Sequence, residues 1–148
     1  MPKGDIMKDI ELAKDLLTKE HLALVIVKQG KIIFKSNEKG IEPLYTAVNE
    51  IKESMNGASV ADKAIGKAAA MLCSYAGINE LYTNLISEKA IDVLSETEIT
   101  YQYENKCSFI KNRNNTGMCP VETLASNTKC IGDLLYGIHE FLKSIKTN

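Results

Sequence analysis

The chain has 148 residues, of which 45% are hydrophobic and 25% are charged, and this composition is ordinary for a soluble globular protein. The length matches one compact domain with its own hydrophobic core, so we expect a single domain over residues 1–148. The formal net charge of −1 gives no basic excess, which argues against nucleic acid or a membrane surface as a partner.

The N-terminal segment is charged and amphipathic. Residues 5–20 place Ile6, Ile10 and Leu17 on one face of a predicted helix, with charged side chains opposite. The segment lacks the apolar stretch of a secretory signal, and the longest strongly apolar run, residues 22–27, is far too short to span a bilayer. We therefore expect a cytoplasmic protein without a membrane partner.

Two β-rich runs follow the first helix. Residues 22–28 and 31–36 flank Gln29 and Gly30, and a glycine in a two-residue turn is typical of a tight hairpin. The first run is apolar throughout, which indicates a strand that is covered on both faces. After the hairpin, residues 42–51 predict a second, weaker helix with a proline in its first turn.

The middle of the chain is unusually rich in small side chains. After the break at Asn56-Gly57, the spacing of Ser59 and Asp62 (S-x-x-D) resembles a capping box at the start of a helix. We therefore predict a helix that begins near Ser59, continues through ADKAIGKAAAMLCSYA and stops at Gly77. Its alanine residues would let this helix lie close against a sheet.

Strands and helices alternate in the second half of the chain. Residues 80–86 predict a third strand, a helix follows from Ser87, and residues 99–103 alternate as a fourth strand. A polar loop leads into a short helix from about Cys119, and the last helix spans about residues 131–145. This order after an opening hairpin predicts an α/β protein, built as a three-layer α/β/α sandwich with a mixed sheet.

The cysteines do not form a metal-binding or redox pattern. Cys73, Cys107, Cys119 and Cys130 are scattered without a C-x-x-C pair, so the sequence contains neither a zinc knuckle nor a thioredoxin-type pair. The chain has 2 histidines, and the usual ligand spacings for zinc are missing. We therefore expect no metal site and no cofactor.

The order of the elements, together with the segments DKAIGKAAAML and NRNNTGMCPVE, resembles the cytidine-deaminase-like fold. More narrowly, the chain is similar to a small uncharacterised family of bacterial and archaeal proteins with that fold, a domain of unknown function that lacks the deaminase zinc motifs. The resemblance covers roughly residues 5–145, and it implies the fold and its nucleotide cleft.

Deaminases of this fold hold a zinc ion between two helix starts. A His or Cys followed two residues later by Glu opens the central helix, and a P-C-x-x-C pair opens the helix after the third strand. The zinc ion makes hydroxide from water, and the Glu carries the proton. Here residues 61–63 read ADK and residues 87–90 read SEKA, so the resemblance argues against zinc-dependent deamination.

Lys63 and Lys67 are candidates for holding an anion. They lie four residues apart in the predicted central helix, so both ammonium groups would share one face near its N-terminal end. Amide donors and ammonium charges there would bind a phosphate or a carboxylate. Asn112 and Arg113, in the polar loop, could clasp a phosphate or the edge of a base. The alternative interpretation is a solvated lysine face and an exposed turn.

Cys119, Asp62 and Glu122 are candidates for catalysis. Cys119 would be the N-cap of the short helix, with Pro120 at the first helical position and Glu122 answering the cap amide. A thiol at a helix N-terminus can serve as a nucleophile, and Asp62 or Glu122 could then move protons. Against this, cysteine is also a common small buried residue, and neither histidine is near in the sequence.

The sequence leaves three functions open. We favour a metal-free domain that binds a small anionic molecule, such as a nucleotide, through Lys63, Lys67 and Arg113. The alternative is a metal-independent enzyme with Cys119 as its nucleophile. A third interpretation is an interaction module without catalysis that forms a homodimer through a sheet edge or through the last helix. The first two require these side chains to open onto one shared cleft.

Overall fold

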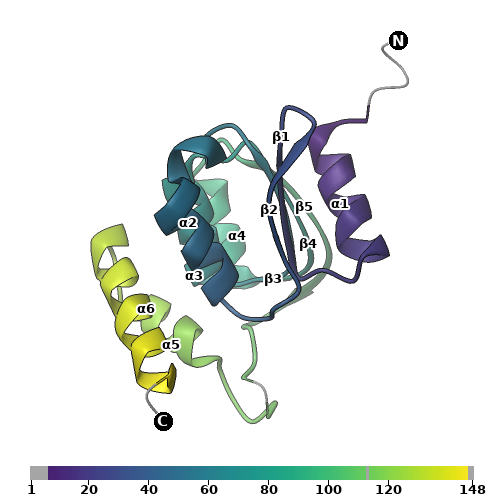
Figure 1. Cartoon of the computed structure of the whole chain (residues 1–148). Helices are drawn as coiled ribbons and strands as arrows, with labels where there is room; N and C mark the ends of the chain where they lie inside the picture. Colours follow the sequence, from purple (N-terminus) through teal and green to yellow (C-terminus); the bar gives the residue numbers. More distant parts are fainter. Residues whose placement is uncertain (1–6, 113, 147–148) are drawn as a thin grey trace.

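The computed structural model of the chain describes residues 7–112 and 114–146, which form one mixed sheet with helices on both of its faces (Figure 1). None of the described helices is long and apolar enough to cross a membrane. The elements follow the chain in the order α1 (Asp9–Lys19), β1 (Leu24–Lys28), β2 (Lys31–Ser36), α2 (Glu42–Met55), β3 (Ser59–Ile65), α3 (Lys67–Ala76), β4 (Glu80–Ser87), α4 (Glu88–Ser95), β5 (Thr100–Cys107), α5 (Pro120–Ser126) and α6 (Ile131–Lys146).

The strands of the sheet lie in the order β2-β1-β3-β4-β5. β1 pairs antiparallel with β2 and with β3, whereas β3, β4 and β5 run parallel to one another. Parallel neighbours need a crossover connection, which α3 supplies between β3 and β4, and α4 between β4 and β5. The mixed sheet is therefore confirmed. Both crossover helices begin at the carboxyl ends of the parallel strands that precede them.

The opening hairpin has the turn that its sequence predicts. Gln29 and Gly30 have φ values of 51° and 78°, the left-handed region that a two-residue hairpin turn requires. The carboxylate of Asp9 in α1 accepts a hydrogen bond from the backbone N–H of each residue, both at 2.8 Å. The start of α1 is thereby attached to the hairpin.

Helices cover the two faces of the sheet unequally. α1 packs alone on one face, where Ala13 and Leu17 meet Val25, Ala61 and Tyr82 in a small buried cluster. The larger core lies on the other face, under α2, α3 and α4, and α5 and α6 pack outside these helices (Figure 1). The layers confirm the predicted α/β/α sandwich, which is the arrangement that the cytidine-deaminase-like resemblance implied.

The prediction of a helix from Ser59 is wrong, because residues 59–65 form the central strand β3. Its first residues are buried between β1 and β4, so pairing on both sides outweighs the helical preference of a small-sided segment. The S-x-x-D pattern is no cap either, since the Asp62 carboxylate accepts a hydrogen bond from Ala64 N at 3.3 Å within the strand. The helix begins at Lys67 and ends, as predicted, at Gly77, whose φ is 74°.

The remaining elements agree with the predictions and differ at their ends. α2 continues to Met55 past non-helical backbone at Ile51, and β5 continues to Cys107, four residues beyond the predicted strand end at residue 103. α1 begins at Asp9, and the first two residues of the predicted helix lie outside the described part of the chain.

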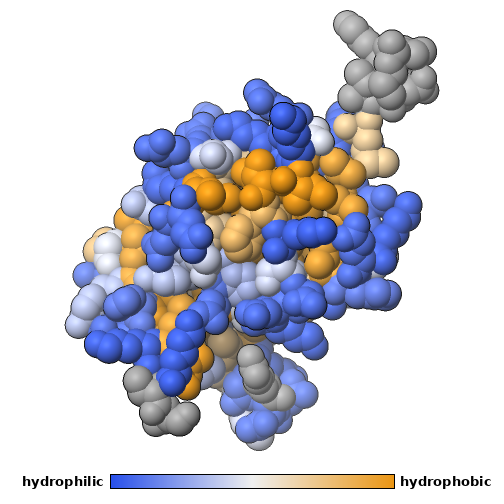
Figure 2. All heavy atoms as spheres, in the orientation of Figure 1, coloured by the Kyte–Doolittle hydropathy of each residue, from blue (hydrophilic) through white to orange (hydrophobic). Residues whose placement is uncertain are grey.

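The visible surface is mostly hydrophilic, and a strip of apolar side chains lies over β2, between α2 and α1 (Figure 2). β2 contributes Ile32, which is 42% exposed, to this face, and its next two residues, Ile33 and Phe34, are partly buried against the core. β2 is also one of the two edges of the sheet.

Candidate functional site

The N-terminus of α3 is closed by a carboxylate from a distant part of the chain. Glu122 Oε1 accepts a hydrogen bond from Lys67 N at 2.7 Å, and Oε2 accepts one from Ala68 N at 3.2 Å. The first N–H groups of a helix have no partner within the helix, and the helix dipole favours negative charge at this end. Glu122 provides both the hydrogen-bond acceptors and the negative charge, and the residue is only 7% exposed.

Gly66 gives Glu122 the room to approach. A Cβ atom on Gly66 would lie 2.2 Å from the carboxyl carbon of Glu122, a distance at which something must move. The φ of Gly66 is −101°, so the requirement for glycine here is one of space and not of backbone conformation. The anion position that the sequence suggested at a helix N-terminus is therefore filled by the chain itself.

The position of Glu122 is set by the short helix α5. Cys119 is its N-cap and Pro120 its first residue, as predicted, and Val121 and Ala125 are buried in the main core. The predicted capping box is wrong, because Glu122 binds the start of α3 while Cys119 N donates to Ile110 O at 2.8 Å. Glu122 therefore caps a neighbouring helix in place of its own.

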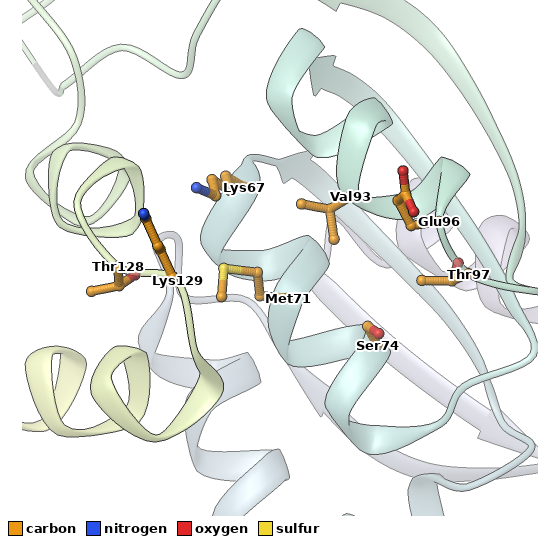
Figure 3. A pocket seen from close by; sticks show the side chains of 8 residues that line it. All are labelled: Lys67, Met71, Ser74, Val93, Glu96, Thr97, Thr128 and Lys129. Carbon is orange, nitrogen blue, oxygen red and sulfur yellow. The ribbon is translucent and has the colours of Figure 1, made fainter.

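An open groove of about 430 Å³ lies beside this contact, between α3, α4 and the segment that follows α5 (Figure 3). Lys67 and Lys129 extend toward one another at one end of it, whereas Glu96 lies away from them on the α4 side (Figure 3). An overlapping hollow of about 320 Å³ adds Lys89 and Asp92. The larger groove is lined by Lys67, Met71, Ser74, Val93, Glu96, Thr97, Thr128 and Lys129.

The lysines of the groove have no ion-pair partner in the described part of the chain. The salt bridges there join Lys14, Lys19, Lys35 and Lys146 to carboxylates, and none involves Lys67, Lys89 or Lys129. Two like charges that face each other across a groove repel, and a bound anion would remove that repulsion. The cationic end of the groove is thus chemically suited to an anion.

Of the predicted ligand-binding residues that the structure describes, only Lys67 lines the groove. Lys63 is an exposed residue of β3, and its backbone N donates to Ala23 O at 3.1 Å. Lys63 and Lys67 therefore do not share a helix face, because Lys63 lies in β3 and Lys67 is the first residue of α3. Asn112 is hydrogen-bonded within its own loop to Thr116, and Arg113 lies outside the described residues.

Cys119 is half-buried and packs against the main core. Its backbone is held in place by Ile110 and Thr123, and within residues 7–112 and 114–146 no histidine or carboxylate hydrogen-bonds its thiol. It does not line the groove. Among the described residues, this arrangement therefore gives the Cys119 thiol no base that would activate it as a nucleophile.

Asp62 is half-buried in β3, between Leu24 of β1 and Thr83 of β4. Burial raises the pKa of its carboxyl group from 3.8 to about 7, and hydrogen bonds from backbone N–H groups oppose this only in part. The pKa of Cys73 in α3 is raised by burial and, to a smaller extent, by the charge of Asp62. Asp62 could exchange a proton near neutral pH, but it does not line the groove.

Lys129 and Lys89 were missed by sequence reasoning. Lys129 lies in the polar link between α5 and α6, and no motif or periodicity marks it. It comes next to Lys67 only because α5 packs on α3. Lys89 is in the SEKA segment that was compared with the deaminase motif, and its relation to Lys67 depends on how α3 and α4 pack.

A helix begins directly after each of the parallel strands β3 and β4. α3 begins at Lys67 after its N-cap Gly66, which corrects the helix start predicted near Ser59. α4 begins at Glu88 after its N-cap Ser87, whose hydroxyl accepts from Ala90 N at 3.1 Å. Among the described residues, no group of three or more His, Cys, Asp or Glu side chains could hold a metal ion. The fold is an α/β/α sandwich, and residues 61–63, 66–68 and 87–90 contain neither histidine nor cysteine.

Residues 12–142 match the family described as a domain of unknown function (DUF1893, TM1506), and the chain belongs to this family. It is similar to the crystal structure of a DUF1893 family protein (TM1506) from Thermotoga maritima, with 24% sequence identity, a TM-score of 0.80, and 91% of each chain covered. No curated protein matches the chain.

Partial overlaps occur with two further solved proteins. Acinetobacter baumannii RibD, form 1, has 20% identity and a TM-score of 0.47, over 65% of this chain and 33% of RibD. The dCMP deaminase from the cyanophage S-TIM5, in its apo form, has 15% identity and a TM-score of 0.46, over 67% of this chain and 94% of the deaminase.

Proposed function

We propose that this protein binds a small anionic molecule, such as a nucleotide or another phosphate compound, at the Lys67 and Lys129 end of the groove. The observation that supports this most is the pair of ammonium groups that face each other on an open surface without a carboxylate partner among the described residues. A phosphate between them would make charge-assisted hydrogen bonds to both.

The rest of the groove suits a ligand that is larger than free phosphate. Its volume falls within the range of roughly 300–1,000 Å³ that is common for small-molecule sites. Met71 and Val93 provide apolar surface, on which a base or another flat group would lie. Ser74 provides a hydroxyl group toward the other end, where a sugar or a base edge would bond, while the Thr97 hydroxyl there already donates to Leu94 O.

The ligand would be held by side-chain ammonium groups and not by the amides of α3. Those amides already donate to Glu122, so the helix N-terminus has no donor to offer at its first two positions. Binding through flexible, solvated lysines is sensitive to ionic strength, because exposed charges are screened by salt. We therefore expect affinity to fall as salt is added.

A thermal-shift series with ATP, GMP and inorganic pyrophosphate tests the proposal. A ligand that binds the native state stabilises it by RT ln(1 + L/Kd), where L is the free ligand concentration, so the melting temperature rises as L exceeds the dissociation constant Kd. We expect at least one of these probes to raise the melting temperature of the wild-type protein. The Lys67→Gln/Lys129→Gln double variant should lose most of that shift, because both charges are removed while the amide of residue 67 is kept.

The matched control is the Lys31→Gln/Lys143→Gln double variant, which loses the same charge on β2 and α6. It should keep the wild-type shift. If none of the three probes changes the wild-type melting temperature, or if both double variants lose the shift equally, the proposed groove is not the binding site.

A further inference from the structure

The outer edge of β5 is open in the described part of the chain. β5 is the last strand of the sheet, and its partner on the inner side is β4. Six of its eight residues are exposed, and Tyr103 is 42% exposed. An edge strand presents unpaired backbone N–H and C=O groups, which are a template for pairing with another strand.

The opposite edge, β2, carries features that protect a sheet edge. Its register with β1 shifts at Ile33, because Ile26 pairs with Phe34 while Val27 pairs with Ile32. A bulge of this kind and edge lysines, here Lys31 and Lys35, discourage strand pairing. β5 has no such interruption: its pairing with β4 keeps one constant register from residue 100 to residue 107, and the strand contains no proline.

The side chains of β5 have an alternating arrangement with a charged pair on one face. Glu104 accepts a hydrogen bond from the Tyr82 hydroxyl, and Tyr82 belongs to the cluster under α1. Glu104 therefore lies on the α1 face of the sheet, and by alternation Lys106 lies there too. Lys106 has no ion-pair partner in the described part of the chain.

We propose that β5 pairs antiparallel with β5 of a second copy of this chain, about a two-fold axis at Asn105. In that register Glu104 of each copy lies opposite Lys106 of the other, so the two-fold forms two identical pairs of opposite charge. Such a pair is favourable across neighbouring strands, and a self-complementary patch is what a two-fold dimer requires. Tyr103 of each copy is covered by Cys107 of the other.

Neighbouring registers that keep the same faces together are less favourable. An axis at Glu104 would place the two Glu104 carboxylates opposite each other, and an axis at Tyr103 would leave Lys106 opposite Thr100 without a carboxylate. A dimer through β2 would also bring like charges together. With an axis at Ile33, Lys31 of each copy would lie opposite Lys35 of the other. The charge pattern thus selects both the edge and the register. The dimer is independent of the proposed groove, to which β5 contributes no residue.

Charge reversal at the two positions tests the register, with sedimentation equilibrium over a concentration series as the measurement. We expect the wild-type protein to dimerise, and Glu104→Lys and Lys106→Glu each to weaken the dimer by about tenfold or more, because two attractive pairs become repulsive. An equimolar mixture of the two variants should regain the wild-type affinity as a heterodimer, since every opposed pair is again of opposite sign.

The rescue also separates pairing from folding, because Glu104→Lys removes the contacts of Glu104 with Tyr82 and Lys14. The Lys31→Glu variant on the β2 edge should dimerise like the wild type. A wild-type protein that stays monomeric at several hundred micromolar overturns the proposal. It is equally overturned if the single variants dimerise normally, or if the mixture shows no gain over either variant alone.

Discussion

The units β3–α3 and β4–α4 lie side by side, with their strands parallel. They differ in the side chains that bind the strand backbone and that cap the start of the helix. Asp62 and Thr83 occupy equivalent positions in register, and each side chain binds the backbone N–H two residues on, at 3.3 Å in both cases. The β4 residue is neutral, whereas the β3 residue is an acid with a raised pKa.

The helix starts differ in the same way. α4 is capped by Ser87 from the residue before it, while α3 is capped by Glu122 from 55 residues along the chain. In both comparisons the ionisable group, Asp62 or Glu122, serves β3–α3, and Lys67 extends from this unit into the groove. The helix cap of β4–α4 is therefore local in the sequence, whereas the cap of β3–α3 forms only when α5 packs against α3.

The largest expected effect is that of Gly66→Ala. The new Cβ would lie 2.2 Å from the Glu122 carboxyl group, so Glu122 must leave the two amides that it satisfies. Losing two charge-assisted hydrogen bonds in a buried site should lower the free energy of unfolding by about 3 kcal/mol. Urea denaturation measures this change.

A control for Gly66→Ala comes from Gly117→Ala, because a Cβ there would meet nothing within 4 Å. It should change stability by less than about 0.5 kcal/mol. In addition, the Gly66→Ala/Glu122→Ala double variant should be more stable than the sum of the single changes predicts, since the clash disappears with the carboxylate. Strict additivity would mean that the two residues are not in contact.

The contrast between the units also explains what the sequence could predict. Local signals were sufficient for the hairpin at Gln29-Gly30 and for α4, which begins at the Ser87 cap. β3 was predicted as a helix because its small residues have a helical preference, and its strand state comes from pairing with β1 and β4. Pairing with distant strands cannot be detected from the hydrophobic periodicity of a short stretch of sequence.

The candidate site was predictable only in its residue types. Lys67 was named as a partner of Lys63 near a helix start at Ser59, whereas the helix starts at Lys67 itself, and its neighbour Lys129 comes from a link between helices without a motif. Glu122 fits a capping box by its spacing from Cys119, and only the packing of α5 on α3 directs it elsewhere. A sequence pattern gives the local partner of a side chain, whereas tertiary packing decides between that partner and a distant one.

A smaller effect is expected from Asp62→Asn, and it depends on pH. The folded protein keeps the Asp62 proton up to about pH 7, whereas the unfolded chain releases it near 3.8. The folded state therefore binds more protons in this window, and the free energy of unfolding falls as the pH rises through it. The variant should lack this contribution, so its stability relative to the wild type should increase by about 1–2 kcal/mol between about pH 5 and pH 7.

Denaturation series at several pH values measure that difference, with Asp133→Asn on the exposed surface of α6 as the control. The control should follow the wild-type pH dependence. If Asp62→Asn does so as well, Asp62 is ionised in the folded protein throughout, and the electrostatic contrast with Thr83 is not present.

The smallest expected effect is that of Ser87→Ala at the start of α4. The change removes one neutral cap, the hydrogen bond from Ala90 N to Ser87 Oγ at 3.1 Å, and leaves the rest of β4–α4 intact. Losing a serine N-cap costs about 1 kcal/mol, well below the cost expected at Gly66, because no charge and no distant segment are involved. It should also leave the thermal shift with nucleotides unchanged. A loss of stability comparable to that of Gly66→Ala would mean that α4 depends on its serine cap as much as α3 depends on Glu122. The two units would then not differ in how strongly their caps stabilise them.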